Sequence, residues 1–184
     1  MPDLPVWEQR FRAPTRTLPV WSPAMPERFV LRSDEICSFQ AYAWEHGAEP
    51  RRLTDERVGI TLATVSGDGS SLVWFSDPTG DESGRWLAVP FEGGEPRELL
   101  PGAPVGWPEG LSLGRELVVA VLADRDGFAV HVSEDGGAAK EMSGNRDCEA
   151  GLVKVTEGSV TITAVVIRWK TEQGPVKVEQ QISA

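Results

Sequence analysis

The chain has 184 residues, of which 40% are hydrophobic and 25% charged, and it contains 19 Gly, 14 Pro and 7 Trp. This composition is typical of one folded domain and excludes an intrinsically disordered chain. The formal net charge is −10 and the basic residues are scattered, so the chain would repel a phosphate backbone and nucleic acid is excluded as a partner.

The two cysteines and the N-terminal sequence bear on the cellular compartment. Cys37 and Cys148 lie far apart and have no CxxC partner, so we expect two reduced thiols rather than a disulfide scaffold or a metal site. Residues 1–5 lack the basic and apolar regions of a signal peptide, and no apolar run is long enough to span a bilayer. These features predict a cytoplasmic protein with no membrane partner.

Short β-prone runs separated by turn clusters dominate the sequence. No window of about a dozen residues keeps apolar positions at helical spacing without an interrupting Gly or Pro. Apolar runs at 72–75, 117–122 and 160–167 alternate with turn clusters such as 66–69 and 134–137. The predicted fold class is therefore all-β.

Two landmarks recur with the same period along the first three quarters of the chain. A Gly-containing turn that leads into a short polar strand occupies 47–53 and 93–99, and a less similar copy occupies 136–142. An Asp closes an apolar strand at Asp34, Asp77 and Asp124. Both landmarks repeat about every 45 residues, which is the length of a four-stranded β-propeller blade.

In chain order, this pattern predicts an N-terminal arm at 1–17, blades at 18–53, 62–100 and 110–142, and an atypical β-meander tail at 143–184. Gly in the turn before the outermost strand supplies a positive φ, and Pro at that strand blocks edge pairing because it has no N–H. The tail lacks both landmarks, although its sequence still predicts strands. Three explanations of the tail remain open: a degenerate fourth blade, a graft, or a rearranged coding sequence.

Three motifs resemble the blades of TolB-like propellers, of the PD40 and WD40-like type. They are Trp21-Ser22-Pro23, the turn Ser66-Gly67-Asp68-Gly69 before an apolar run, and the outer turn Gly93-Gly94-Glu95-Pro96-Arg97. Residues 36–142 in particular resemble the N-terminal propeller of prolyl-oligopeptidase-like serine peptidases of the S9 family. The resemblance covers about residues 7–142. It implies a propeller that gates the access of substrate to a separate α/β-hydrolase domain.

No catalytic residue of that family can be assigned in this chain. The nucleophile elbow of an α/β-hydrolase needs G-x-S-x-G, and the nearest string, Gly80-Asp81-Glu82-Ser83-Gly84, has the wrong spacing. We therefore expect a non-catalytic, truncated propeller fragment that hydrolyses neither peptides nor esters. The alternatives are a free-standing TolB-like protein-interaction module and a small β-barrel enzyme with a ligand pocket.

Asp81 and Glu82 are the candidate binding residues, because some members of the resembled family hold a peptide's amino terminus with propeller carboxylates. A solvated turn is the alternative for this pair. His46 and His131 have no Ser, Cys or carboxylate at a local spacing that suits a base or a metal ligand, so we expect polar or edge histidines. The stretch Asp124-Arg125-Asp126-Gly127 lacks the downstream Glu of a calcium loop and predicts a hairpin turn. No cofactor and no metal are predicted.

The expected partners are an α/β-hydrolase domain or a peptide, as the resemblance implies. Three blades cannot close a ring by themselves, because propellers close with about four to eight blades. The open blade edges therefore predict self-association, or partial closure of the arc by the tail.

Overall fold

The computed structural model describes residues 13–114, 117–134, 136–145, 149–156, 161–170 and 174–183, with side chains as far as Glu141. These residues contain no helix, and therefore none long and apolar enough to cross a membrane. Their strands form four separate antiparallel sheets. The predicted all-β class is confirmed, and the alternative of a single closed barrel is wrong because none of these sheets joins another.

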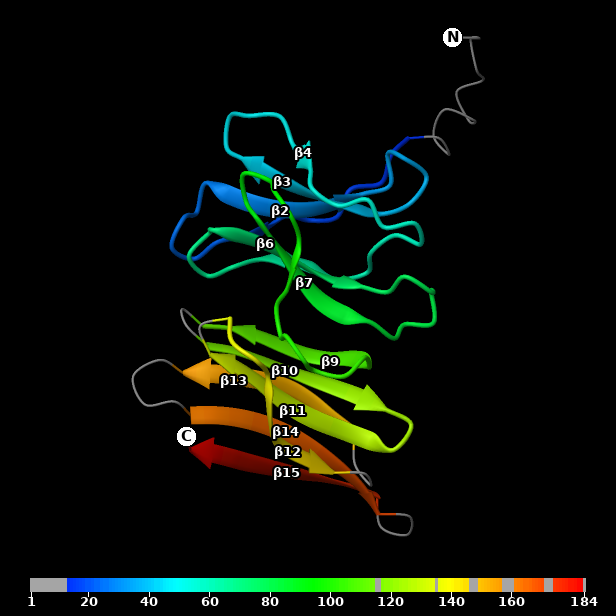
Figure 1. Cartoon of the computed structure of the whole chain (residues 1–184), viewed down its shortest axis with the longest axis vertical. Helices are drawn as coiled ribbons and strands as arrows, with labels where there is room; N and C mark the ends of the chain where they lie inside the picture. The colour runs from blue at the N-terminus through cyan, green and yellow to red at the C-terminus, as the bar shows by residue number, and fades with distance from the viewer. Residues whose placement is uncertain are drawn as a thin grey trace.

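Three of the sheets have four strands each and follow one another along the molecule (Figure 1). The first consists of β1 (Val20–Trp21), β2 (Arg28–Ser33), β3 (Gln40–Glu45) and β4 (Arg51–Arg52). The second consists of β5 (Ala63–Val65), β6 (Ser71–Ser76), β7 (Arg85–Pro90) and β8 (Arg97–Glu98). The third consists of β9 (Trp107–Leu113), β10 (Leu117–Asp124), β11 (Gly127–Glu134) and β12 (Lys140–Asn145). Strands that are consecutive in the sequence pair in every sheet, so the predicted partial propeller of about three blades is confirmed.

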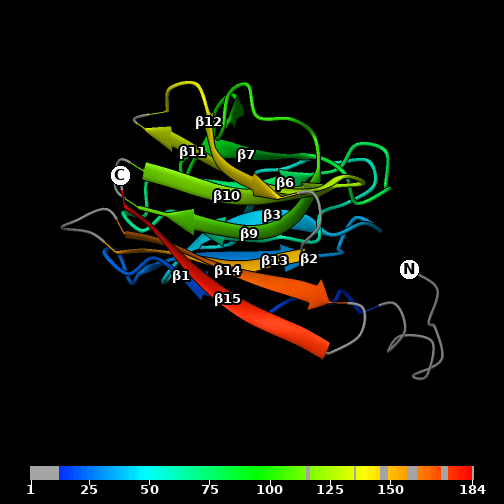
Figure 2. The same cartoon turned by 90° about the horizontal axis from the view of Figure 1, so that it is seen from below.

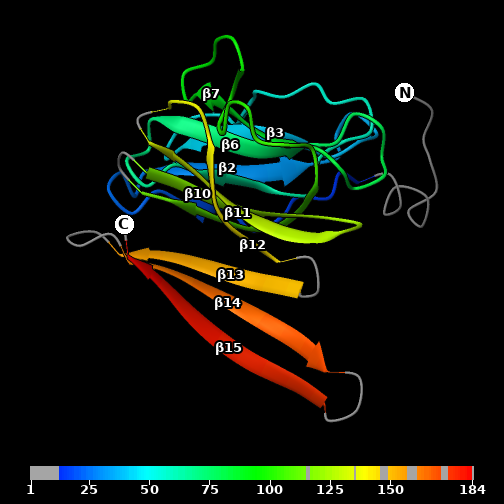
Figure 3. The same cartoon turned by 60° about the horizontal axis from the view of Figure 1, so that its bottom comes forward.

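The tail forms a three-stranded sheet of β13 (Glu149–Thr156), β14 (Thr161–Lys170) and β15 (Gly174–Ser183). The backbone of β13 contacts β9 and β10, just as the first strand of the second sheet, β5, contacts β1 and β2. Figure 2, seen from the end of the tail, places β14 and β15 in front of the other sheets, and Figure 3 shows β15 farthest from them. The predicted β-rich tail is confirmed, and its sheet takes the next place in the series.

The landmark residues have the conformations that the repeat predicts. The first glycine of each outer turn has a positive φ, with values of 85° at Gly47, 98° at Gly93 and 70° at Gly136. The second strand of each sheet ends at or directly before the landmark Asp34, Asp77 or Asp124. Asp124 pairs with Gly127 across a two-residue turn, so the expected hairpin is confirmed.

The second sheet is buried on both faces. Leu72 and Trp74 of β6 belong to the hydrophobic core between the first and second sheets. Val73 and Phe75 belong to the core between the second and third sheets. Successive side chains of a strand point to opposite faces, so a strand between two cores must be apolar at every position. This explains why residues 72–75 form a continuous apolar run rather than an alternating one.

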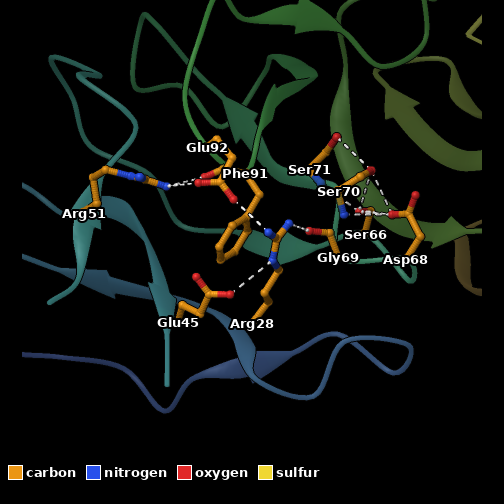
Figure 4. A network of polar contacts seen from close by, with 10 residues as sticks. All are labelled: Arg28, Glu45, Arg51, Ser66, Asp68, Gly69, Ser70, Ser71, Phe91 and Glu92. Atoms are coloured by element: carbon orange, nitrogen blue, oxygen red, sulfur yellow. Dashed lines mark hydrogen bonds and ion pairs between the residues drawn. The ribbon is translucent and has the colours of Figure 1, made fainter. Parts of the chain in front are cut away.

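A polar cluster centred on Arg28 joins the first and second sheets (Figure 4). Its guanidinium donates from Nη1 to the Gly69 carbonyl oxygen at 3.0 Å and from Nη2 to Glu92 Oε1 at 2.7 Å. The Arg28 Cζ atom also lies 4.7 Å from the centroid of the Phe91 ring. Gly69 precedes β6, while Phe91 and Glu92 follow β7, so one side chain of β2 holds two turns of the second sheet.

Apolar side chains stay exposed on β1 and in the segments directly before β1 and β5. The Trp21 side chain on β1 is 62% exposed, and Leu18 and Leu62 are exposed beside it. A groove of about 490 Å³ runs past Trp21 and Leu62 to Leu111 and Leu113 of β9. The self-association expected from open blade edges stays a prediction.

Candidate functional site

The loop between β6 and β7 folds around the carboxylate of Asp77. Asp77 Oδ1 accepts hydrogen bonds from the Thr79 amide at 3.2 Å and the Gly80 amide at 2.7 Å. Asp77 Oδ2 accepts a hydrogen bond from the Glu82 amide at 2.7 Å. Three backbone N–H groups thus donate to the one Asp77 carboxylate and fix the conformation of the loop. The landmark Asp that follows β6 therefore organises this turn.

Asp81 and Glu82, the two predicted binding residues, have different roles in this loop. Asp81 Oδ1 accepts hydrogen bonds from Thr79 Oγ1 at 2.7 Å and the Ser83 amide at 3.2 Å, and the bond from Thr79 lowers the pKa of Asp81. Glu82 has a φ of 66°, and its carboxylate has no partner among the residues that the structure describes. Glu82 lines the neighbouring cleft, whereas Asp81 does not.

We call this cleft the acidic cleft; its volume is about 700 Å³. It is bordered by the loop before β3, the linker 58–62, the β6–β7 loop and the start of β9. Its lining has an apolar part, formed by Phe39, Val58, Ile60, Leu62, Phe75, Trp107 and Pro108, and a carboxylate part, formed by Asp77, Glu82 and Glu109. None of the lining residues that the structure describes is basic. The cleft is thus suited to a ligand that carries a positive charge beside an apolar group.

Backbone hydrogen bonds between neighbouring segments hold the walls of the acidic cleft. The Gly84 amide donates to the Gly106 carbonyl oxygen at 3.0 Å, and the Gly106 amide donates back to the Gly84 oxygen at 3.3 Å. The Ile60 amide donates to the Phe39 carbonyl oxygen at 2.9 Å. The Nε1 of Trp107 donates to the Asp81 carbonyl oxygen at 3.3 Å. The cleft is therefore built from residues of all three blades before any ligand binds.

His131 differs from its expected position. The sequence predicts a polar or edge histidine, but His131 is only 3% exposed and pairs with Glu141 of β12. The expected edge position is wrong for His131, because β11 lies between β10 and β12 and the side chain is buried. Burial lowers the pKa of the His131 ring, and the charge of Glu141 opposes that effect only in part.

The lowered pKa of His131 predicts acid-sensitive folding. A histidine whose pKa is lower in the folded chain than its ordinary 6.5 binds its proton more readily in the unfolded chain. The free energy of unfolding should therefore be highest above pH 6.5 and fall as the pH decreases toward the folded pKa. Glu141 favours the charged form of the ring, but burial outweighs it.

Urea unfolding between pH 5 and 8 tests this prediction. His131→Gln should remove a slope of up to about 1.4 kcal/mol per pH unit below pH 6.5. His46→Gln is the matched control, because His46 is exposed, and it should leave the slope unchanged. Equal slopes for wild type and His131→Gln would contradict the prediction.

The described residues offer no assembled catalytic or metal-binding group. Neither His46 nor His131 forms a side-chain hydrogen bond with another described residue. Within the same part of the chain, no three His, Cys, Asp or Glu side chains are placed to hold a metal ion. Cys37 is an exposed free thiol, and Cys148 lies outside the described residues.

No protein-family model and no curated protein matches the sequence. The structure is similar to TolB from Acinetobacter baumannii, with a TM-score of 0.51 and 19% identity over 71% of this chain and 33% of TolB. A structure from a study of two prolyl endopeptidases gives a TM-score of 0.58 and 13% identity over 95% of this chain and 30% of that chain. The puromycin-hydrolyzing peptidase of Mycobacterium tuberculosis gives 0.51 and 16% identity over 84% of this chain and 26% of that one.

The chain spans a third or less of the length of each of these three proteins. At 13–19% identity, the likeness concerns the fold. It agrees with the three meander sheets and with the motifs that resemble TolB-like and S9-type propellers. The chain therefore has the β-propeller fold that its repeat predicts, as a partial propeller that resembles those of TolB and the prolyl endopeptidases.

Proposed function

We propose that this chain is a non-catalytic propeller that binds peptides in the acidic cleft and so gates their passage. The observation that carries this proposal is that one cleft of about 700 Å³ combines an aromatic wall with the carboxylates of Glu82 and Glu109, neither of which has a partner among the described residues. Two of the similar structures are peptidases, which supports peptides as the ligand class.

The cleft would recognise the amino group and the side chain of a peptide's first residue by different means. The carboxylates of Glu82 and Glu109 attract the terminal ammonium, because a charged donor and a charged acceptor form the stronger hydrogen bonds. Phe39, Phe75 and Trp107 bury an apolar side chain next to it. Asp81 does not line the cleft; its hydrogen bonds to Thr79 and Ser83 stabilise the loop and thus position Glu82.

Bond cleavage is no part of this proposed role. Acyl transfer by a serine peptidase needs a nucleophile, a base and an oriented acid, and the described residues bring no such set together. In the proposal, an α/β-hydrolase domain is the partner that performs the chemistry, and this propeller selects what reaches it.

The proposal predicts that binding depends on a free amino terminus. A hexapeptide with an N-terminal Phe and a fluorescein at its C-terminal Lys should bind about tenfold more tightly than its N-acetylated form, because acetylation removes the charged donor. The double variant Glu82→Gln/Glu109→Gln should lose this preference. Fluorescence anisotropy titrations of the four combinations measure it.

Glu95→Gln is the matched control, since Glu95 is exposed, has no partner among the described residues and lies outside the cleft. It should keep the preference for the free amine. Equal affinity of wild type for both peptides would refute recognition of the amine. Release of peptide fragments, together with labelling of a serine by a fluorophosphonate, would refute the non-catalytic role.

A further inference from the structure

Two segments of the chain line both the acidic cleft and the groove of about 490 Å³ described above, which we call the inner groove. Residues 58–62 line the cleft and residues 62–65 line the groove, so this segment leads from one to the other without a break. In the same way, residues 107–109 of β9 line the cleft and residues 111–113 line the groove. Both segments run from the cleft to the groove in the direction of the chain. The cleft and the groove are therefore successive parts of one trough.

The inner groove follows the edges of strands rather than the face of a sheet. Successive side chains of a strand point to opposite faces, so a groove on a face would be lined by every second residue. Instead, every residue from 62 to 65 and from 111 to 113 lines this groove. The backbone of both segments thus borders the groove as well as their side chains.

Each of these two strands keeps one edge without a strand partner. Among the described strands, β5 pairs only with β6, and β9 pairs only with β10. The tail strand β13 contacts β9 but pairs only with β14. β9 has seven residues and β5 has three, so β9 offers the longer edge. Such an edge is a template on which another extended chain can form backbone hydrogen bonds.

The two parts of the trough differ in charge. The acidic cleft has three carboxylates in its lining, whereas none of the described residues that line the inner groove is charged. Large apolar side chains are 40–62% exposed along the trough, at Val20, Trp21, Val58 and Leu62. Exposed apolar side chains that gather in one hollow indicate a binding surface. The trough is suited to a chain with a positive charge at one end and an apolar group farther along it.

We propose that the trough binds the first five or so residues of an extended peptide, whose backbone pairs in parallel with the edge of β9. This inference rests on the proposed function, because the amino terminus of the peptide occupies the acidic cleft. Only a peptide, and not a simple alkylamine, brings the backbone N–H and C=O groups that a strand edge can bond.

The length of β9 sets the register of the peptide. An extended chain advances about 3.3 Å per residue, so Glu109 and Leu113 are separated by about 13 Å along the strand. A peptide whose first residue lies beside Glu109 therefore places its fifth residue beside Leu113. An apolar side chain at that fifth position would contact Trp21 and Leu113, which both line the inner groove.

Competition with the fluorescein-labelled hexapeptide tests the proposal on the wild-type chain. The hexapeptide Phe-Ser-Ser-Ser-Leu-Ser-amide should bind about tenfold more tightly than Phe-Ser-Ser-Ser-Ser-Ser-amide, since only the first buries a leucine in the inner groove. The dipeptide Phe-Ser-amide should bind more weakly than both, because it reaches no part of the β9 edge beyond the cleft. Each competitor is also measured with an acetylated amino terminus.

Backbone N-methylation tests the pairing with β9. Along a β-ladder the N–H groups of successive residues point to opposite sides, so only every second one can reach the strand edge. N-methylation at the third or the fourth residue of the leucine hexapeptide should therefore weaken binding about tenfold at one position and have little effect at the other. Equal effects at the two positions would overturn the pairing.

A pair of variants ties the leucine to the inner groove. Trp21→Ala should weaken binding of the leucine hexapeptide about fivefold and leave the dipeptide unaffected. Ile36→Ala is the matched control, because Ile36 is 44% exposed and lines neither the cleft nor the groove. It should bind both peptides as wild type does. Unchanged affinity of Trp21→Ala for the leucine hexapeptide would refute the assigned contact.

The acetylated competitors separate this inference from the proposed function. If all free-amine peptides bind equally well and each more tightly than its acetylated form, the trough is refuted and the recognition of the amine stands. If acetylation changes no affinity, the proposed function fails and the trough fails with it.

Discussion

Gly84→Ala is expected to destabilise the chain by about 3 kcal/mol or more. A Cβ atom at position 84 would lie 1.9 Å from the Ser76 carbonyl oxygen and 3.0 Å from Cε1 of Phe75. The oxygen belongs to β6, whose Ser76 pairs with Arg85 of β7, and the Phe75 ring is buried between two sheets. Neither atom can move away without breaking the ladder or the core.

The same substitution should also impair the acidic cleft. Gly84 exchanges two backbone hydrogen bonds with Gly106, and it directly follows the loop that carries Glu82. A shift of Gly84 therefore separates the second blade from the start of β9, where Trp107 and Glu109 line the cleft. Any Gly84→Ala chain that remains folded should bind the free-amine peptide more weakly than wild type.

Urea unfolding followed by tryptophan fluorescence measures the change in stability. Gly67→Ala is the matched control, because its added Cβ would lie 3.9 Å from the nearest atom, the Leu113 carbonyl oxygen, and its φ is not in the left-handed range. The control should change stability by no more than about 0.5 kcal/mol. A similar small effect of Gly84→Ala would show that Gly84 is not packed tightly against the Ser76 carbonyl oxygen and the Phe75 ring.

The sequence predicts the blades well because each blade is a local structure. Its strands pair with their neighbours in the chain, so a turn residue and an apolar run suffice to place them. Gly47 and Gly93 illustrate this, since their positive φ angles follow from the turn before a short outer strand. The run 72–75 likewise reveals a strand buried on both faces.

The candidate site could be predicted only in part, because it is assembled from segments far apart in the sequence. The family resemblance singled out Glu82, which lines the cleft, but no sequence pattern linked it to Glu109, which comes from the next blade. Gly106 lacks any local turn signal, since its role arises from the approach of another blade. The burial of His131 was not predicted either; the ring lines one pocket with Pro104 and Val105, which come from the segment before β9.

Arg28→Ala is expected to destabilise the chain by about 2–3 kcal/mol. The change removes the charged hydrogen bond to the Gly69 carbonyl oxygen, the bond to Glu92 and the contact with the Phe91 ring. The Arg28 side chain is only 18% exposed, so water cannot replace these contacts in the folded chain without opening the cluster. Figure 4 shows that the lost contacts are those by which the first blade holds two turns of the second.

Arg51→Ala is the variant against which the effect of Arg28→Ala is compared, because Arg51 contacts the same turn from a more exposed position. Arg51 donates to the Phe91 carbonyl oxygen at 2.8 Å and reaches Glu92 at 3.4 Å. Its side chain is 50% exposed, however, so water can replace these contacts, and exposed pairs contribute about 0–1 kcal/mol. Salt should separate the two variants further, since 1 M sodium chloride screens the exposed pair and leaves the ring contact and the packing of Arg28 largely intact. Urea unfolding of both variants at low and high salt measures this difference. If Arg28→Ala proved no more harmful than Arg51→Ala, the two blades would have to be joined by the apolar core between them, centred on Leu72 and Trp74, and not by the guanidinium.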